Sequence, residues 1–94
     1  MKPRLPNWMT PVDRDILELL RNEGGRELVM NPRHIAENTD WKRPTIREHV
    51  RTLFDYGMIE YYDESGSIYQ LTDEAKEYLA GEIDPKDLEE DDEK

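Results

Sequence analysis

The stretch Asp40–Ile59, DWKRPTIREHVRTLFDYGMI, organises the rest of this chain. Its apolar residues recur at the spacing of one helix face, which predicts a helix over residues 43–56. The residues of this stripe are Ile46, Val50, Leu53 and Phe54. Pro44 falls in the first helical turn, where its missing N–H costs nothing, and Gly57 follows the helix end, where a left-handed backbone is favoured. The stretch is therefore expected to be a helix that packs one side into a core.

The other side of this helix is basic. Between residues 42 and 52 there are four cations and one acid, Glu48. The cations are Lys42, Arg43, Arg47 and Arg51. This local charge of +3 stands in a chain whose net charge is −10. Runs of charge are usually solvated helix faces, but cations concentrated on one short helix of an acidic protein favour contact with the phosphates of a nucleic acid.

The composition bounds the fold and the compartment. The chain has 94 residues, 35% hydrophobic and 38% charged, so one small domain with a core built from a few apolar stripes is expected. No segment is long and apolar enough to cross a bilayer, and no signal segment opens the chain, which predicts no membrane association. The absence of cysteine excludes disulfides and thiolate chemistry and fits a cytoplasmic location.

The acidic charge is uneven along the chain. Residues 82–94 hold eight acids and two lysines, whereas residues 1–81 hold fifteen acids and eleven bases. Apolar content falls away in the same region, so residues 83–94 are expected to be a disordered acidic tail. Arginine outnumbers lysine by eight to five, and an acid-rich surface with few lysines is typical of halophilic proteins. An acidic protein from an organism of ordinary salinity is the alternative.

Short elements separated by turn residues make up the remainder. An irregular arm is expected over residues 1–9, in which Trp8 and Met9 either fold back onto the domain or belong to a frayed end. The folded domain is expected over residues 10–82. Its elements are a helix from Pro11 to the Gly24-Gly25 pair with Val12, Ile16, Leu19 and Leu20 as its stripe, a brief strand over 27–30, a helix over 33–38, the basic helix over 43–56, strands over 58–62 and 67–71, and a last helix that begins near Thr72.

Two helices joined by the tight turn Thr39-Asp40 and followed by a hairpin have the order of a helix-turn-helix with a wing. Residues 45–53 with residues 56–60 are similar to the reader helix and the start of the wing in ArsR-like and MarR-like families. Residues 10–13, 35–40, 71–75 and 78–82 resemble the small winged-helix repressors of the archaeal phage type found in extreme halophiles. The resemblance covers residues 8–84 and implies an α+β winged helix-turn-helix domain with a three-helix core, a β-hairpin wing and a C-terminal helix.

The resemblance places the DNA contacts at the start and on the exposed face of the reader helix. The implied contact residues are Lys42, Arg43, Thr45, Arg47, Glu48 and Arg51. An arginine in the major groove pairs bidentately with guanine, whereas Glu48, where many relatives carry a basic or small polar residue, accepts from cytosine N4. The wing tip Asp63–Gly66 is acidic where many relatives carry cations, so it is not expected to grip DNA closely.

No catalytic or metal-binding pattern stands out in the sequence. His34 and His49 lie on different predicted helices, the acids show no general acid–base pairing, and no glycine-rich phosphate loop is present. His49 precedes a position of the apolar stripe, which favours a partly packed helix residue over a ligand. The chain is therefore not expected to be an enzyme, and neither a metal nor a cofactor is expected.

The implied function is that of a sequence-specific regulator, a repressor, that reads the major groove of double-stranded DNA with helix 43–56. Small repressors of this type work as symmetric homodimers, and the arm with Trp8 and Met9, together with the first and last helices, is the expected interface. The alternative is a winged-helix interaction module whose acidic wing and tail bind a basic protein. The basic face favours the first function, and the net charge of −10 favours the second.

Overall fold

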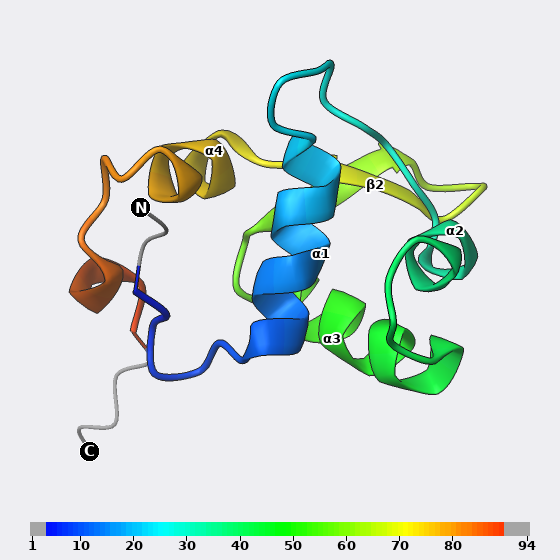
Figure 1. The fold of residues 1–94 in the computed structure, drawn as a ribbon, viewed down its shortest axis with the longest axis horizontal. Helices are drawn as coiled ribbons and strands as arrows, with labels where there is room; N and C mark the ends of the chain where they lie inside the picture. Colours follow the sequence, from blue (N-terminus) through cyan, green and yellow to red (C-terminus); the bar gives the residue numbers. More distant parts are fainter. Residues whose placement is uncertain (1–3, 90–94) are drawn as a thin grey trace.

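Four α-helices and one antiparallel hairpin follow one another over residues 4–89, the part of the chain that this computed structural model describes (Figure 1). The elements are α1 (Pro11–Arg21), α2 (Pro32–Glu37), α3 (Arg43–Asp55), β1 (Ile59–Asp63), β2 (Ile68–Leu71), α4 (Asp73–Leu79) and a short 3₁₀ helix, η1 (Pro85–Leu88). This is the expected α+β winged helix-turn-helix fold, in which α2 and α3 form the helix-turn-helix pair and the β1–β2 hairpin is the wing.

The helix starts follow from local chemistry. The Asn31 side chain accepts a hydrogen bond from the backbone N–H of His34 at 2.8 Å, and the Thr72 hydroxyl accepts one from the backbone N–H of Ala75 at 3.1 Å. These side chains satisfy backbone donors that have no partner in the first helical turn. In α3 a proline in the first turn serves instead, because its missing N–H removes one unpaired donor.

α1 runs through the centre of the molecule, with α2 and α3 on one side and α4 on the other (Figure 1). In α1 the fully buried residues include Leu17, while Leu19, predicted to be in the stripe, is only half-buried. In α3 Ile46, Val50 and Leu53 are buried as predicted. Phe54 was expected in the same stripe but remains 38% exposed, because its ring turns toward the hairpin and packs against two tyrosines there.

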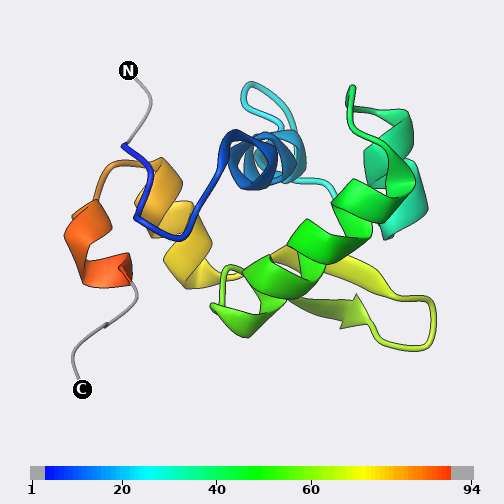
Figure 2. The ribbon, with the colours of Figure 1, turned by 90° about the horizontal axis from the view of Figure 1, so that it is seen from below.

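The wing is a short hairpin in which β1 and β2 pair antiparallel with each other. Ile59 lies opposite Leu71 and Tyr61 opposite Tyr69, with a bulge between Tyr61 and Asp63. The strand predicted over residues 27–30 is reduced to a single bridge, in which the Met30 and Tyr69 backbones exchange two hydrogen bonds of 3.1 and 2.8 Å. The wing tip lies at the same end of the molecule as α2 (Figure 2).

The two ends of the described chain lie side by side (Figures 1 and 2). The Trp8 ring stacks on Tyr56 with ring centroids 4.0 Å apart, and its Nε1–H donates to the carbonyl oxygen of Leu88 at 2.6 Å. The Tyr78 hydroxyl donates to the carbonyl oxygen of Arg4 at 2.6 Å. The arm therefore folds back onto the domain, which was one of the two expectations for it.

The C-terminal segment differs from the disorder expected from residue 83 onward. Pro85–Leu88 is a 3₁₀ turn in which Asp84 Oδ1 accepts a hydrogen bond from the Lys86 backbone N–H at 3.0 Å, and Leu88 packs against the core. The prediction rested on the high charge of this segment. A highly charged segment can still form a docked turn when it contains an apolar residue and a capping aspartate. Here Leu88 packs against the core, and its carbonyl oxygen accepts a hydrogen bond from Trp8. The remaining tail, residues 90–94, lies outside the described residues.

Candidate nucleic-acid interface

The exposed side of α3 divides into a basic strip and an acidic strip. Arg43, Arg47 and Arg51 are four residues apart, so they follow one line along the helix, and all three are exposed. Glu48 lies farther round the helix, and Asp55, two turns after it and four residues after Arg51, lies where the two strips meet and lines the larger hollow described below. The two strips touch where Arg51 Nε approaches Asp55 Oδ1 at 3.3 Å. The cations are thus concentrated on one flank of α3.

A buried carboxylate joins α3 to the start of α1. Asp13 is fully buried, and its Oδ2 accepts hydrogen bonds from the Thr10 backbone N–H at 2.8 Å and the Thr10 hydroxyl at 3.0 Å. Its Oδ1 lies 2.8 Å from Nδ1 of His49 on α3. Burying a carboxylate is costly unless its oxygens are paired in this way. His49 is therefore a packed helix residue, as the sequence indicated, and it helps to set the orientation of α3.

Two adjoining hollows form a trough between α3, the start of α2 and the hairpin. Their volumes are about 400 and 300 Å³, and Pro32, Arg47 and Ser67 line both of them. We call this feature the α3–wing trough. Arg51 lines its larger end, and Arg43 lines its smaller end. The basic strip of α3 thus forms one wall of a groove whose opposite wall is the hairpin.

Aromatic rings form the floor of the larger end of the trough. The centroids of Phe54 and Tyr61 are 5.1 Å apart, and those of Tyr61 and Tyr69 are 4.9 Å apart. Burial, followed by a hydrogen bond with Tyr61, raises the pKa of Tyr69 to about 12. Tyr69 therefore keeps its proton at any physiological pH. The contacts of Phe54 with Tyr61 and Tyr69 join the wing to α3.

The structure brings together some of the predicted contact residues and separates others. Arg43, Arg47 and Arg51 line the trough. Lys42 is exposed at the residue that precedes α3. Glu48 is exposed on the acidic strip and lines neither hollow. Thr45 is half-buried four residues before His49, so it lies on the α1 side of the helix. The predicted six therefore form a basic flank and two outlying positions rather than one continuous surface.

Arg33 is a trough residue that the sequence did not single out. It is the second residue of α2, it lines the smaller hollow beside Arg43 and Arg47, and its side chain is 64% exposed. Its Nε lies 3.5 Å from Oε2 of Glu37, one turn later. The available signal was the helix-turn-helix pattern itself, because that motif packs the second helix against the first and brings their exposed ends together.

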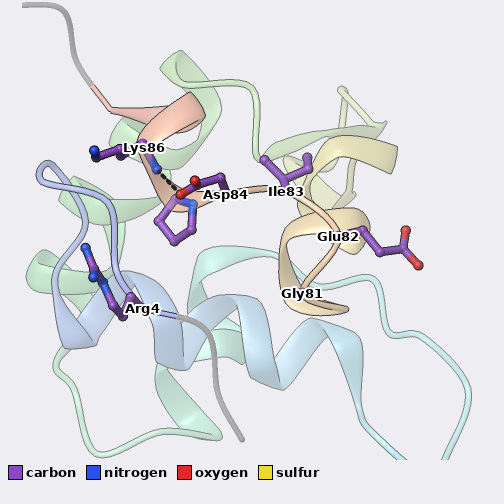
Figure 3. A pocket seen from close by; sticks show the side chains of 7 residues that line it. Arg4, Gly81, Glu82, Ile83, Asp84 and Lys86 are labelled. Atoms are coloured by element: carbon purple, nitrogen blue, oxygen red, sulfur yellow. Dashed lines mark hydrogen bonds between the residues drawn. The ribbon is translucent and has the colours of Figure 1, made fainter.

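A separate hollow of about 660 Å³ lies at the chain ends (Figure 3). The arm contributes Arg4, and the segment after α4 contributes Glu82, Asp84 and Lys86. Charges of both signs line it, so its walls carry no preference for an anion. It shares no lining residue with the α3–wing trough. The α3–wing trough, which Arg43, Arg47 and Arg51 line, is accordingly the candidate interface.

None of the helices in residues 4–89 is long and apolar enough to cross a membrane. Within the same residues, no group of three or more His, Cys, Asp or Glu side chains is arranged to hold a metal ion.

Comparison with known proteins places these features in a family. The family model of the winged helix-turn-helix phage repressor matches residues 1–91. The chain is 38% identical over 87 residues to the repressor protein of Halobacterium phage phiH, which covers 92% of this chain and 96% of that protein. The crystal structure of the PhiH1 repressor-like protein from Haloarcula marismortui shares the fold, with a TM-score of 0.71, 24% identity, and 90% of this chain and 91% of that chain covered. The family is one of repressors and not of enzymes, as the sequence led us to expect.

Proposed function

This chain belongs to the winged helix-turn-helix phage repressor family, and from that premise we propose that it represses transcription by binding a specific sequence of double-stranded DNA. The observation that carries the proposal is the basic strip of α3. Arg43, Arg47 and Arg51 are exposed along one flank in a chain of net charge −10. A positive strip on a negative protein attracts phosphates and directs DNA to that face.

In the proposed complex α3 lies in the major groove. Arg47, near the middle of the helix and between the two hollows, is placed to pair bidentately with guanine O6 and N7. Arg51 follows Arg47 by one turn on the basic strip, and we assign it to the phosphate backbone. Glu48 on the adjoining strip would accept from cytosine N4. The proposed readout thus uses both strips of the helix.

The proposed assembly is a two-fold homodimer whose half-sites lie about one helical turn, roughly 10 base pairs, apart. The arm was expected to supply part of its interface. Met9 is 5% exposed and Trp8 stacks on Tyr56 of its own chain, so these side chains are already used inside the molecule. The first and last helices, which the sequence also predicts to be part of the interface, remain the proposed contact surfaces. Sedimentation with and without duplex, in high salt, tests the assembly. Only monomer at tens of micromolar in both cases would contradict it.

The central experiment is selection of bound sequences from a random duplex pool in molar KCl. The acidic composition motivates the salt, because strong self-repulsion is screened there and function in concentrated salt is part of the proposal. We expect one enriched motif with two-fold symmetry. A repressor acts where the DNA is, so the proposed location is the cytoplasm. Recovery of a random pool after several rounds, from folded protein, would contradict specific reading.

A second candidate function is protein binding by the wing. The hairpin exposes Tyr62 to 62% together with the acids Glu60, Asp63 and Glu64. An acidic surface with an exposed aromatic ring suits a basic protein partner. The selection separates the two functions, because a wing that binds a basic protein predicts no enriched motif. Protein binding by the wing also predicts that Tyr62→Ser weakens binding to the basic protein, whereas Arg47→Ala leaves that binding unchanged.

A further inference from the structure

Three arginines meet at the smaller end of the α3–wing trough. Arg33 comes from α2, and Arg43 and Arg47 come from α3, and all three line the hollow of about 300 Å³. Gly66 and Ser67 of the wing tip line the same hollow. The start of α2, the start of α3 and the wing tip lie at one end of the molecule in both views (Figures 1 and 2). We call Arg33, Arg43 and Arg47 the arginine notch.

The arginine notch has few acidic neighbours, although the protein as a whole carries a net charge of −10. No carboxylate lines the hollow. Among residues 4–89, Arg43 and Arg47 make no ion pair within 4.0 Å, and Arg33 pairs only with Glu37 at 3.5 Å. Asp63 of the wing lines neither hollow, and its Oδ1 accepts hydrogen bonds from the Ser65 backbone N–H and hydroxyl at 3.1 and 2.8 Å. Convergent cations repel one another, and an external anion relieves that repulsion.

We propose that the arginine notch binds one backbone phosphate of the target DNA, which makes Arg33 of α2 a phosphate contact. The inference deepens the proposed function and rests on it. Guanidinium groups bind phosphate oxygens through paired N–H donors. Arg33 and Arg43 supply these donors at the smaller hollow, whereas Arg47, which lines both hollows, keeps its paired donors for guanine. The Ser67 hydroxyl on the wing side supplies a further donor. In a helix-turn-helix complex the first helix crosses the backbone beside the groove, which is where Arg33 stands.

The notch also gives the acidic wing a role. A wing tip with Asp63 and Glu64 is repelled by the phosphates of a minor groove. Gly66 and Ser67, which follow these acids, have no charge and form the wall of the notch. The wing then closes one side of a phosphate site on the protein instead of reaching into the neighbouring groove. This arrangement predicts contact at a single backbone position on the wing side of each half-site.

The test compares the parent with Arg33→Ala on duplexes in which one phosphate at a time is a neutral methylphosphonate. In the parent, one methylphosphonate position per half-site should weaken binding by roughly tenfold. In Arg33→Ala, binding to the unmodified duplex should fall by a similar factor for all sequences alike. The same methylphosphonate should then cost less than it does in the parent, because one of the guanidinium partners of that phosphate is gone. Additive losses at every position would overturn the proposal.

Two variants serve as matched controls. Arg26→Ala removes the same charge from an exposed loop that lines neither hollow, and it should leave binding within a factor of about two. Glu37→Gln removes the only ion-pair partner of Arg33 among the described residues and should strengthen binding. Arg33 is 64% exposed, so its replacement is expected to leave the melting temperature unchanged. Equal binding by the parent and Arg33→Ala would overturn the proposal.

The failure of this inference is distinct from that of the proposed function. The salt dependence of binding to any duplex reports phosphate contacts even without sequence preference, and each contact contributes a slope of about −0.9 in log–log terms. Arg33→Ala should make the slope shallower by about one for each chain bound. A random selection with that change would remove specific reading but keep the notch. An enriched motif with no change in slope would remove the notch but keep specific reading.

Discussion

The two ends of the molecule use their polar groups in opposite ways. At the chain ends, the Tyr78 hydroxyl, the Trp8 indole N–H and the Lys86 backbone N–H all donate to partners within the same chain. At the α3–wing trough, Arg43 and Arg47 form no ion pair with any of residues 4–89. Polar groups that are satisfied internally hold a structure together. Cations that stay unpaired on an acidic protein are available to an external anion.

This difference separates stability from binding. Changes at the chain ends should lower the free energy of unfolding and leave the affinity for DNA per folded molecule unchanged. Changes in the trough should lower the affinity for DNA and leave the free energy of unfolding unchanged. A chain-end variant that changed DNA specificity, or a trough variant that unfolded the protein, would break the comparison.

The largest effect is expected from Trp8→Ala. The indole stacks on Tyr56 at 4.0 Å and donates to Leu88 at 2.6 Å, so its removal loses an aromatic contact, a hydrogen bond and part of the packing around η1. We expect the free energy of unfolding to fall by about 3 kcal/mol, at the lower end for a tryptophan truncation because Trp8 is half-buried. Urea unfolding in high salt measures it.

The matched change on the other side of this contact is the removal of residues 85–94. It takes away the Leu88 carbonyl and the 3₁₀ turn but leaves the Trp8 ring on Tyr56, so a smaller loss of about 1 kcal/mol is expected. Equal melting temperatures for the parent and the shortened chain would show that η1 contributes no stability.

The next largest effect is expected from Arg47→Ala. It should weaken binding to the selected sequence by about 1–3 kcal/mol and relax the preference at one base pair. Arg51→Ala should weaken all duplexes alike, because we assign it to the backbone. Both residues are exposed, so neither variant should change the free energy of unfolding. If the double variant, with a native-like spectrum, binds like the parent, α3 is not the reader.

Much of the fold was readable from the sequence because its signals are local. The cap-and-proline starts at residues 10–11 and 31–32, the apolar spacing of α3 and the change of period after Gly57 all depend on neighbouring residues. The family match confirms the resemblance that these segments indicated. Phe54 was placed wrongly because a stripe drawn on one helix does not say which neighbour covers each side. Leu19 is half-buried and packs against the core, as the stripe predicted.

The site was only partly readable because its arrangement depends on contacts between distant residues. The basic residues of α3 were evident from their charge, and the structure places three of them in one trough. Arg33 was not singled out from the sequence. Asp13 and His49 were both considered but were not paired, because they lie 36 positions apart and only the fold brings them together. The docking of Leu88 by Trp8 spans 80 positions and was missed for the same reason.

A third prediction concerns salt and the acids that border the DNA face. A dimer with about eight phosphate contacts would lose roughly 10⁷-fold in affinity between 0.1 and 1 M salt. Glu48, Asp63 and Glu64, held close to phosphates, would take up cations as the complex forms and offset the counterions that the arginines release. We expect a shallow salt dependence in the parent and a slope steeper by a few units when the three acids are replaced by their amides. Titrations of the same duplex from 0.2 to 2 M KCl measure both slopes. An ordinary steep loss in the parent would contradict this use of the acids.

The smallest effects are expected from removing one hydroxyl at each end of the molecule. Tyr78 is fully buried at the chain ends and donates to the Arg4 carbonyl, so Tyr78→Phe should lower the free energy of unfolding by about 1 kcal/mol at neutral pH. Tyr69 lies in the trough and is only partly buried, so Tyr69→Phe should change the neutral-pH value less.

The two tyrosines also allow the comparison to be tested by pH. Burial first, and then the hydrogen bond with Tyr61, raises the pKa of Tyr69 to about 12, above the value near 10 of an unfolded chain. The folded state therefore holds the proton more tightly than the unfolded state does. This contribution is fully present below pH 10 and is lost as the pH rises through 12. The stability difference between the parent and Tyr69→Phe should accordingly shrink across that interval, by a small amount because solvent screens a partly exposed group. Urea unfolding at pH 9, 10.5 and 11.5 in molar KCl measures it. A difference that stays constant with pH would mean that the trough does not hold Tyr69 against Tyr61 in solution.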